Sequence, residues 1–434
     1  MRLFFAMGPG DTVQDARNSR GLTDSQHDKP RHGETSITFS GQLIRLLEKR
    51  GHNALLVSSH SRADELQIGA IRLINLPRKL DGARGLAFYW SRIAYAWRLA
   101  NLARRSGADF AIIDSGTTNF FALWTFRRYG IPVAVNFHNV RWAQGFAPTH
   151  GVSRIVRALD SYFFRHGALA ALGCSPACAD QARIDGADAL PFYGWTAQYS
   201  GKGFPAPSAA LNCQADPLRL VFVGRVEVNK GVFDLIDIAR GLREHGLGGA
   251  HITVCGNGTA LDAFRDAVAA SSVADMITIR GRLERAELLV AYAASSLVIV
   301  PTRSDFTEGM PLVCAEAMLA LRPVLASRVT NAIPVLGAAM LEAIPDDPAS
   351  YVAQIVRFAS DPLLRAELGQ AILAAREQFL DRRLSYAAAI DAMLGDVGHQ
   401  QQMPLDYAAL FPEDGSEQEP AFAPALKPVF ERGA

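Results

Sequence analysis

The sequence is poor in cysteine and carries almost no net charge, and both properties exclude certain classes of function. Five cysteines stand among 434 residues, with no Cys-x-x-Cys pair and no histidine at zinc-site spacing. The cysteines are therefore interpreted as small buried residues of a reducing compartment rather than as metal ligands. The formal net charge is +1, whereas a general nucleic-acid binder carries a large basic excess. No nucleic-acid partner is expected.

Long apolar stretches are equally scarce. The opening run, residues 1–7, is shorter than the apolar part of a secretory signal and is predicted to be a first buried strand. No segment approaches the roughly 20 uncharged apolar residues that a membrane-spanning helix needs. A cytoplasmic protein is expected, with any membrane contact peripheral and at the inner face of the plasma membrane.

Short apolar runs alternate with helical patterns along most of the chain, which is typical of parallel sheets with crossover helices. The pattern stops at Ser200–Pro217, a stretch rich in proline, glycine, serine and alanine, and then restarts. We therefore predict an α/β protein with two Rossmann-like domains that face each other across a cleft. The predicted strands cover residues 3–7, 54–57, 71–76, 110–114, 133–137 and 169–172, and then 218–223, 251–255, 276–280, 297–300 and 324–326.

The predicted domain boundaries follow from this pattern. The first domain covers residues 1–205, the linker 206–217 and the second domain 218–380, and a terminal helix at 381–394 packs back toward the first domain. From residue 395 to 434 the composition is that of a tail without fixed structure. A polar connection, Gly8–Thr35, is interpreted either as a functional loop at the ligand edge of the sheet or as a surface insertion.

The segment 301–318 (PTRSDFTEGMPLVCAEAM) holds the most informative pattern. A predicted strand ends where it begins, and Pro311 suits the first residue of a helix. Gly309 allows the backbone to approach a ligand, and the helix start offers amide groups that attract phosphate. Glu308 and Glu316 flank this start, so one carboxylate can reach a sugar and the other a ribose. The alternative is a capping role for Glu308 and a solvated or paired position on the helix face for Glu316.

A second segment, 221–231 (VFVGRVEVNKG), opens the second domain with a strand and a turn at Gly224. It is neither a GxGxxG dinucleotide motif nor a P-loop. Instead it brings Arg225 and Lys230 to the carboxyl end of a strand, where ligands of open α/β sheets bind. Two cations there can neutralise a diphosphate without a metal. Two solvated surface charges are the ordinary alternative.

Both segments carry a resemblance to a known family. The patterns at 224–231 (GRVEVNKG) and 308–318 (EGMPLVCAEAM) resemble the signatures of the retaining glycosyltransferases of family four, which have the GT-B fold. Residues 279–283, 292–301 and 322–327 are also similar to that family. The resemblance is specific over residues 218–330 and diffuse over the first domain, and its type is that of bacterial surface-polysaccharide assembly.

The resemblance implies a role for each residue of the site. Arg225 and Lys230 would bind the donor diphosphate, Glu316 would hold the ribose and Glu308 would contact the transferred sugar. His138 would lie near the reacting carbon, in the place of a family histidine that follows a strand. The other implied donor contacts are the amides of Gly309 and Met310, their neighbours Pro311 and Leu312, the base-contacting Arg282 and Leu283, and the glycines Gly33 and Gly224.

Several positions depart from the family pattern. Leu321 stands where a glycine is usual, the segment 330–335 lacks the expected glycines and acid, and 191–195 (PFYGW) replaces the usual Asn-Gly motif. Only one glycine, Gly33, is present where the first loop of the family commonly has two. These positions would border the donor and the acceptor. The departures therefore leave the identity of the transferred sugar undetermined, whereas they affect the predicted class of reaction less.

No Asp-x-Asp motif is present, so a reaction without a metal or other cofactor is predicted. The charge on the leaving nucleotide, UDP or GDP, would be met by Arg225, Lys230 and the helix start near Met310. The resemblance implies retention at the anomeric carbon. The sequence places no carboxylate opposite the leaving group, so front-face attack is predicted rather than a double displacement.

Residues 77–105 interleave arginines with aromatic residues in a predicted helix of the first domain. Such a helix could lie on an anionic membrane surface, where a polyprenyl-diphosphate-linked glycan would be the natural acceptor. The alternative is an ordinary amphipathic helix whose aromatic residues pack on the sheet.

Rival functions stay open beside glycosyl transfer. A nucleotide-sugar epimerase or hydrolase on the same fold would consume the donor without an acceptor. A non-catalytic nucleotide-sugar-binding subunit would keep the diphosphate site and lose the sugar-facing carboxylate, so the presence of Glu308 favours an enzyme. A dinucleotide dehydrogenase is disfavoured because neither domain opens with GxGxxG.

Overall fold

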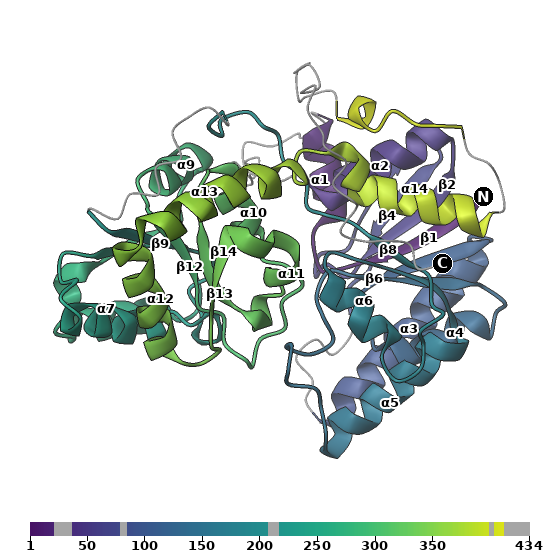
Figure 1. Cartoon of the computed structure of the whole chain (residues 1–434). Helices are drawn as coiled ribbons and strands as arrows, with labels where there is room; N and C mark the ends of the chain where they lie inside the picture. Colours follow the sequence, from purple (N-terminus) through teal and green to yellow (C-terminus); the bar gives the residue numbers. More distant parts are fainter. Residues whose placement is uncertain (21–36, 79–84, 207–216, 399–402, 412–434) are drawn as a thin grey trace.

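The computed structural model describes residues 1–20, 37–78, 85–206, 217–398 and 403–411. The expected donor contact Gly33 lies outside these residues, and so does most of the expected linker. Two separate sheets organise the described chain, one before the linker and one after it (Figure 1). The predicted α/β class with two Rossmann-like sheets is confirmed.

The first sheet has eight strands in the order β3-β4-β2-β1-β5-β6-β7-β8, and the second has six in the order β11-β10-β9-β12-β13-β14. Every neighbouring pair is parallel except β3 with β4. The strands are β1 (Arg2–Met7), β2 (Asn53–Ser58), β3 (Asp64–Ile68), β4 (Ile71–Asn75), β5 (Phe110–Asp114), β6 (Val133–Phe137), β7 (Ala168–Gly173), β8 (Phe192–Gly194), β9 (Arg219–Val223), β10 (His251–Cys255), β11 (Ile277–Gly281), β12 (Leu297–Val300), β13 (Val324–Ser327) and β14 (Met340–Ala343).

Helices cover both faces of each sheet, which is why the central strands are apolar on both sides. In the first domain α1, α2 and α14 lie on one face and α3 to α6 on the other (Figure 1). The helices are α1 (Thr12–Ser19), α2 (Phe39–Arg50), α3 (Leu86–Arg105), α4 (Trp124–Arg127), α5 (Gly151–His166), α6 (Pro176–Arg183), α7 (Asp234–Glu244), α8 (Leu261–Ala269), α9 (Arg285–Ala293), α10 (Leu312–Leu319), α11 (Ile333–Leu336), α12 (Pro348–Ser360), α13 (Pro362–Glu377) and α14 (Tyr386–Val397).

Helix α2 shows how local sequence sets an element. The side chain of Thr38 accepts a hydrogen bond from the Gly41 amide at the helix start, and Gly51 ends the helix in the left-handed conformation with a φ of 65°. Between these signals Leu43 and Leu47 lie on one face and are fully buried.

The connection predicted at residues 8–35 is not one continuous loop. It contains α1, whose start is capped because the Asp11 side chain accepts a hydrogen bond from the Gln14 amide at 3.0 Å. Arg17 of α1 forms an ion pair with Asp64 of the edge strand β3. The helix was missed because its short polar sequence has little apolar periodicity.

Helix α14 is the last long helix of the described chain, yet it packs on the first sheet. Tyr386, Ile390 and Met393 are buried in the first-domain core. The tail predicted to lack structure from residue 395 is partly ordered, because α14 runs to Val397 and Leu410 is 3% exposed in the same core. That expectation is wrong for residues 395–397, which continue α14, and for Leu410 and Phe411, whose apolar side chains are buried in a polar stretch.

Candidate functional site

A hollow of about 200 Å³ lies between the two domains. It brings together sequence-predicted residues from both halves of the chain, because the loops after β6 and β12 meet there. The first half contributes Phe39, His138, Asn139, Cys174, Trp195, Thr196 and Ala197, and the second contributes Glu308, Met310, Pro311, Leu312, Ala315 and Phe379.

The two predicted cations lie against one aromatic ring, and one of them lies beside the first glutamate. Lys230 forms an ion pair with Glu308, and both side chains are largely buried, at 14% and 12% exposed. Arg225 is 57% exposed and its guanidinium bonds the Glu227 carboxylate at 2.9 Å. The ring of Phe306 joins the cations, since its centroid lies 4.2 Å from Lys230 Nζ and 5.5 Å from Arg225 Cζ.

Phe306 was not predicted as a site residue. An aromatic residue in a polar loop gives no spacing signal, and its function depends on two cations that lie about 80 positions earlier in the chain. In the structure it is the one ring that both Arg225 and Lys230 stack on among the described cation–π contacts.

The loop that follows Lys230 fits tightly against the next strand end. Gly231 has a φ of 72°, and a Cβ atom there would lie 2.0 Å from the carbonyl oxygen of Pro301. Only glycine allows both this backbone conformation and this approach. The close packing fixes the distance between Lys230 and the loop that carries Glu308.

Helix α10 begins beside Glu308. Pro311 is its N-cap residue and Leu312 its first helical residue, so the prediction that Pro311 opens the helix is wrong by one position. No side chain caps the helix start. Asn331, which has a φ of 56°, donates a hydrogen bond to the Glu308 carbonyl and so supports the loop from below. Asn331 was noted only as a departure from the family pattern.

Glu316 is buried on α10 rather than on a surface face. The Tyr292 hydroxyl donates a hydrogen bond to its carboxylate at 2.7 Å. Burial and the neighbouring Glu316 charge raise the pKa of Tyr292 far above its usual range, so this tyrosine stays a donor. The protein itself therefore supplies one of the partners that the buried carboxylate needs.

His138 lies at the end of β6, beside a buried carboxylate. Its Nε2 atom is 3.1 Å from the Asp114 carboxylate, and Asn136 donates to the other oxygen of Asp114 at 2.8 Å. Burial lowers the pKa of His138, but the charge of Asp114 and their hydrogen bond outweigh burial, and the pKa is raised. Trp195 fixes Asn136 through a hydrogen bond of 2.9 Å. Asp114 and Asn136 were not predicted as site residues.

The two domains touch at Gly309. A Cβ atom at this position would lie 2.0 Å from the carbonyl oxygen of His138 and 2.6 Å from the sulfur of Cys174. The glycine thus allows the Glu308 loop to lie directly against the loop of His138. Sequence reasoning assigned Gly309 to a ligand contact, and the structure adds this contact between domains.

Seven of the predicted donor residues that the structure describes do not line the hollow, namely Gly224, Arg225, Lys230, Arg282, Leu283, Gly309 and Glu316. Arg282 is exposed and Leu283 half-buried in the turn after β11, and Glu316 lies deeper in α10. Across the described ranges no three His, Cys, Asp or Glu side chains gather as a metal site would require. The prediction of a metal-free reaction stays a prediction.

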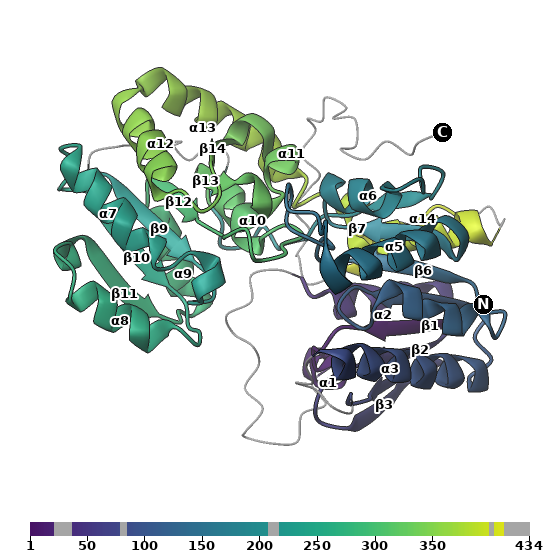
Figure 2. The ribbon, with the colours of Figure 1, turned by 90° about the horizontal axis from the view of Figure 1, so that it is seen from below.

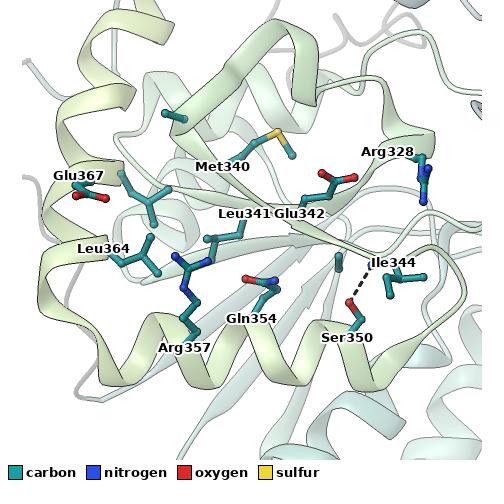
Figure 3. A pocket seen from close by; sticks show the side chains of 13 residues that line it. Arg328, Met340, Leu341, Glu342, Ile344, Ser350, Gln354, Arg357, Leu364 and Glu367 are labelled. Carbon is teal, nitrogen blue, oxygen red and sulfur yellow. Dashed lines mark hydrogen bonds between the residues drawn. The ribbon is translucent and has the colours of Figure 1, made fainter.

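A larger hollow of about 610 Å³ lies at the edge strand β14, between α12 and the start of α13 (Figure 3). Ser350, Gln354 and Arg357 of α12 line it on one side, and residues of the strand, among them Leu341 and Glu342, line it as well. It contains none of the motif residues. We therefore place the candidate site in the smaller hollow, where the motifs of both domains meet.

Comparison with known proteins defines the class. A model described as "Glycosyl transferase 4-like domain" matches residues 36–191, and one described as "Glycosyl transferases group 1" matches residues 217–361. Among curated proteins the chain is 29% identical to the glycogen synthase of Mycobacterium tuberculosis over 163 residues. That stretch covers 36% of this chain and 37% of the relative.

Solved structures share the whole architecture. The sucrose-phosphate synthase of Thermosynechococcus elongatus is 17% identical, with a TM-score of 0.66 over 92% of this chain and 99% of that one. The Anabaena protein HepE, in complex with UDP and glucose, is 13% identical, with a TM-score of 0.57 over 92% and 100%. At such identities the likeness shows the fold alone, and that fold is the GT-B fold predicted from the sequence.

The class is thus a two-domain GT-B protein, and the candidate site lies between its domains. The two matching models together cover more than half of the residues. The chain belongs to the group 1 glycosyltransferases of family four.

Proposed function

We propose that the protein is a metal-independent hexosyltransferase that moves a sugar from a UDP- or GDP-linked donor to a lipid-linked glycan during polysaccharide assembly. The observation that carries this proposal is the Lys230–Glu308 ion pair just before α10, because Glu308 lines the same hollow as His138 of the first domain. Lys230 and the start of α10 would meet the diphosphate of the donor, and the neighbouring Glu308 carboxylate would meet its sugar.

The donor diphosphate would bind Lys230 and Arg225, beside the first amides of α10. Gly224 lets the strand end turn toward the ligand, while Gly309, Met310, Pro311 and Leu312 form the opposite wall. Arg282 and Leu283 would contact the base, and Glu316, oriented by Tyr292, would hold the ribose. The roles of these residues rest on the family patterns and on the geometry described above.

Binding would also rearrange the pair of Lys230 and Glu308. A diphosphate that takes over the ammonium group of Lys230 frees the Glu308 carboxylate to accept hydrogen bonds from the sugar. Glu308 lies in a largely buried position, where charges interact more strongly than in water. The carboxylate would then stabilise positive charge as it develops on the sugar ring.

The transfer would proceed on one face of the sugar. As the bond from the anomeric carbon to the phosphate oxygen breaks, the acceptor oxygen forms its bond from the same side. The leaving phosphate oxygen takes the acceptor proton, and Lys230 and Arg225 neutralise the charge that remains on the nucleotide. His138, whose pKa Asp114 holds above its usual value against the effect of burial, would donate a hydrogen bond to the sugar.

The acceptor would approach from the first domain at the inner face of the plasma membrane. None of the helices in the described ranges has both the length and the apolar character that a membrane crossing needs. In the region 77–105, Tyr95 is buried against the sheet while Trp90 is 69% exposed. Part of this helix packs on the sheet, and part of it is exposed and could lie on a membrane surface. We therefore include a peripheral membrane contact in the proposal.

The test incubates the protein with labelled UDP- and GDP-sugars, with and without a polyprenyl-diphosphate-linked glycan. Label should enter the lipid fraction only when protein, donor and acceptor are all present. Release of free sugar at the same rate without the acceptor would make the protein a hydrolase, and binding of the donor without any turnover would make it a non-catalytic subunit.

The variant Glu308→Gln gives the mechanistic test. Turnover should fall about 100-fold or more while nucleotide affinity stays near that of the native protein, because the carboxylate acts on the sugar in the transition state. Glu342→Gln, on the edge strand β14, is the matched control and should leave both unchanged. Undiminished turnover in Glu308→Gln would remove this residue from the mechanism.

A further inference from the structure

Helix α5 carries an apolar stripe on its outer face. Val152, Ile155, Leu159 and Tyr162 follow one another at helical spacing, and each is between 44% and 60% exposed. The inner face is apolar as well, since Phe163 is fully buried in the core. The helix thus presents apolar side chains both to the sheet and to the outside. Packing on the sheet explains the inner apolar face but not the outer one.

The stripe continues over the neighbouring helices through aromatic contacts. The ring of Tyr162 stacks on Trp124 of α4, with ring centroids 5.9 Å apart. Trp97 of α3, itself 41% exposed, stacks at the same distance on Tyr129, which follows α4. Helices α3, α4 and α5 lie side by side on one side of the first sheet (Figures 1 and 2). Together their outer sides form one continuous surface, which we name the α3–α5 face.

This face is basic. Helices α3 and α4 contain no aspartate or glutamate. The single acid of α5, Asp160, is 7% exposed and accepts a hydrogen bond from the Phe121 amide at 2.8 Å. The exposed arginines of the three helices are Arg104, Arg105, Arg127, Arg154 and Arg165.

We propose that the α3–α5 face, centred on the stripe of α5, docks on the surface of an anionic lipid bilayer. Apolar side chains flanked by tryptophan, tyrosine and arginine are the combination that binds the interface of a charged membrane. A second copy of the chain would fit this face less well, because a self-complementary contact brings the same arginines together and like charges repel. The docking rests on the peripheral membrane contact of the proposed function and assigns it to the α3–α5 face, but it does not depend on which acceptor the enzyme uses.

The test measures flotation of the full chain with vesicles of phosphatidylglycerol and phosphatidylcholine, and with vesicles of phosphatidylcholine alone. The native protein should float with the first and stay behind with the second, and raised salt should weaken the binding. The double variant Ile155→Ser, Leu159→Ser should bind the anionic vesicles at least about tenfold more weakly, because it removes apolar area that the native protein would bury in the membrane. Arg154→Glu, Arg165→Glu should lose binding in the same way.

The matched control is Val290→Ser, Leu363→Ser, which changes two exposed apolar residues of the second domain. It should float like the native protein. Thermal melting of all variants should stay unchanged, since the altered side chains lie on the surface.

Three results would overturn the proposal. Flotation that is unaffected by the α5 variants shows that the stripe does not touch lipid. Flotation lost only in Trp90→Ser assigns the contact to α3 alone. A dimer that forms without vesicles and disappears in Ile155→Ser, Leu159→Ser makes the face an interface between copies of the chain.

Discussion

Phe306 lies against both cations of the candidate donor site, and its ring faces Lys230 and Arg225. Replacement by leucine keeps an apolar side chain in the loop but removes the π face that attracts the cations. We expect Phe306→Leu to weaken UDP binding about tenfold, because both cations lose the cation–π contact that holds their side chains in place. Titration calorimetry with UDP measures this effect.

The control for that experiment is Phe146→Leu, which alters an exposed aromatic residue of the first domain. UDP affinity should stay unchanged in it. If Phe306→Leu binds UDP as tightly as the native protein, the ring has no part in positioning the cations.

His138 and Asp114 provide a prediction about pH. The pKa of His138 is raised above the ordinary 6.5, because the charge of Asp114 outweighs burial. Stabilisation from this pair is therefore fully present below about pH 6.5 and is lost as pH rises through the raised pKa. Asp114→Asn removes the charge and weakens the hydrogen bond that raise the pKa of His138, so burial, the largest remaining effect, should bring this pKa below its ordinary value.

NMR titration of the His138 ring measures this pKa directly. The free energy of unfolding, followed against pH, should show the loss above about pH 6.5 in the native protein and not in Asp114→Asn. An unchanged His138 titration in the variant would show that another group sets its charge.

At the scale of single residues, spacing along the chain indicated part of the site. Lys230 and Glu308 each belong to a short motif that is recognisable in the sequence, and in the structure the two side chains form an ion pair. Asp114 has no such signal, because its closeness to His138 depends on two neighbouring strands, β5 and β6, ending at the same edge. Phe306 was missed for a similar reason, since its cations come from a different loop.

The loop between β12 and α10 connects the domains through Gly309, and its substitution tests that element. In Gly309→Ala the new Cβ would lie 2.0 Å from the backbone of His138, so the loop and the first domain must move apart. Turnover should fall about 100-fold, since small misplacements of reacting groups have effects of that size. Steady-state kinetics, with thermal melting to check the fold, measure the outcome.

Gly249→Ala is the control, because its Cβ would meet nothing within 4 Å. Its turnover should equal that of the native enzyme. Full activity in Gly309→Ala would mean that the close approach of the two loops is not needed for transfer.

Among the elements, the central strands and the edge strand β11 were predictable, whereas the other three edge strands were not. Apolar runs such as β5 and β6 are buried on both faces, which leaves a clear mark in the sequence. Strands β3, β8 and β14 each lie at the edge of a sheet and are five, three and four residues long. Strand β3 alternates polar and half-buried positions because one side of it meets solvent, so no apolar run identifies it.

At the scale of the whole molecule, α14 completes the first domain from the far end of the chain. Ile390 of this helix is fully buried against the first-domain core. Ile390→Ala should lower the free energy of unfolding by about 2–5 kcal/mol, the usual cost of such a cavity. Urea unfolding followed by tryptophan fluorescence reports it, because all of the native tryptophans lie in the first domain.

Leu363→Ala serves as the control, since this side chain is 76% exposed on α13 of the second domain. It should change the free energy of unfolding by less than about 0.5 kcal/mol. A similarly small change in Ile390→Ala would mean that α14 contributes little to the stability of the first domain.

The return of α14 also has a consequence for biosynthesis. The first 205 residues leave the ribosome long before residues 386–397 are made, so the nascent first sheet lacks one of the three helices that shield this face. Exposed apolar surface of this kind is where chaperones bind and where aggregation begins. Maturation of the N-terminal half must therefore wait until α14 has been made, and gene fragments that stop before α14 should give insoluble product.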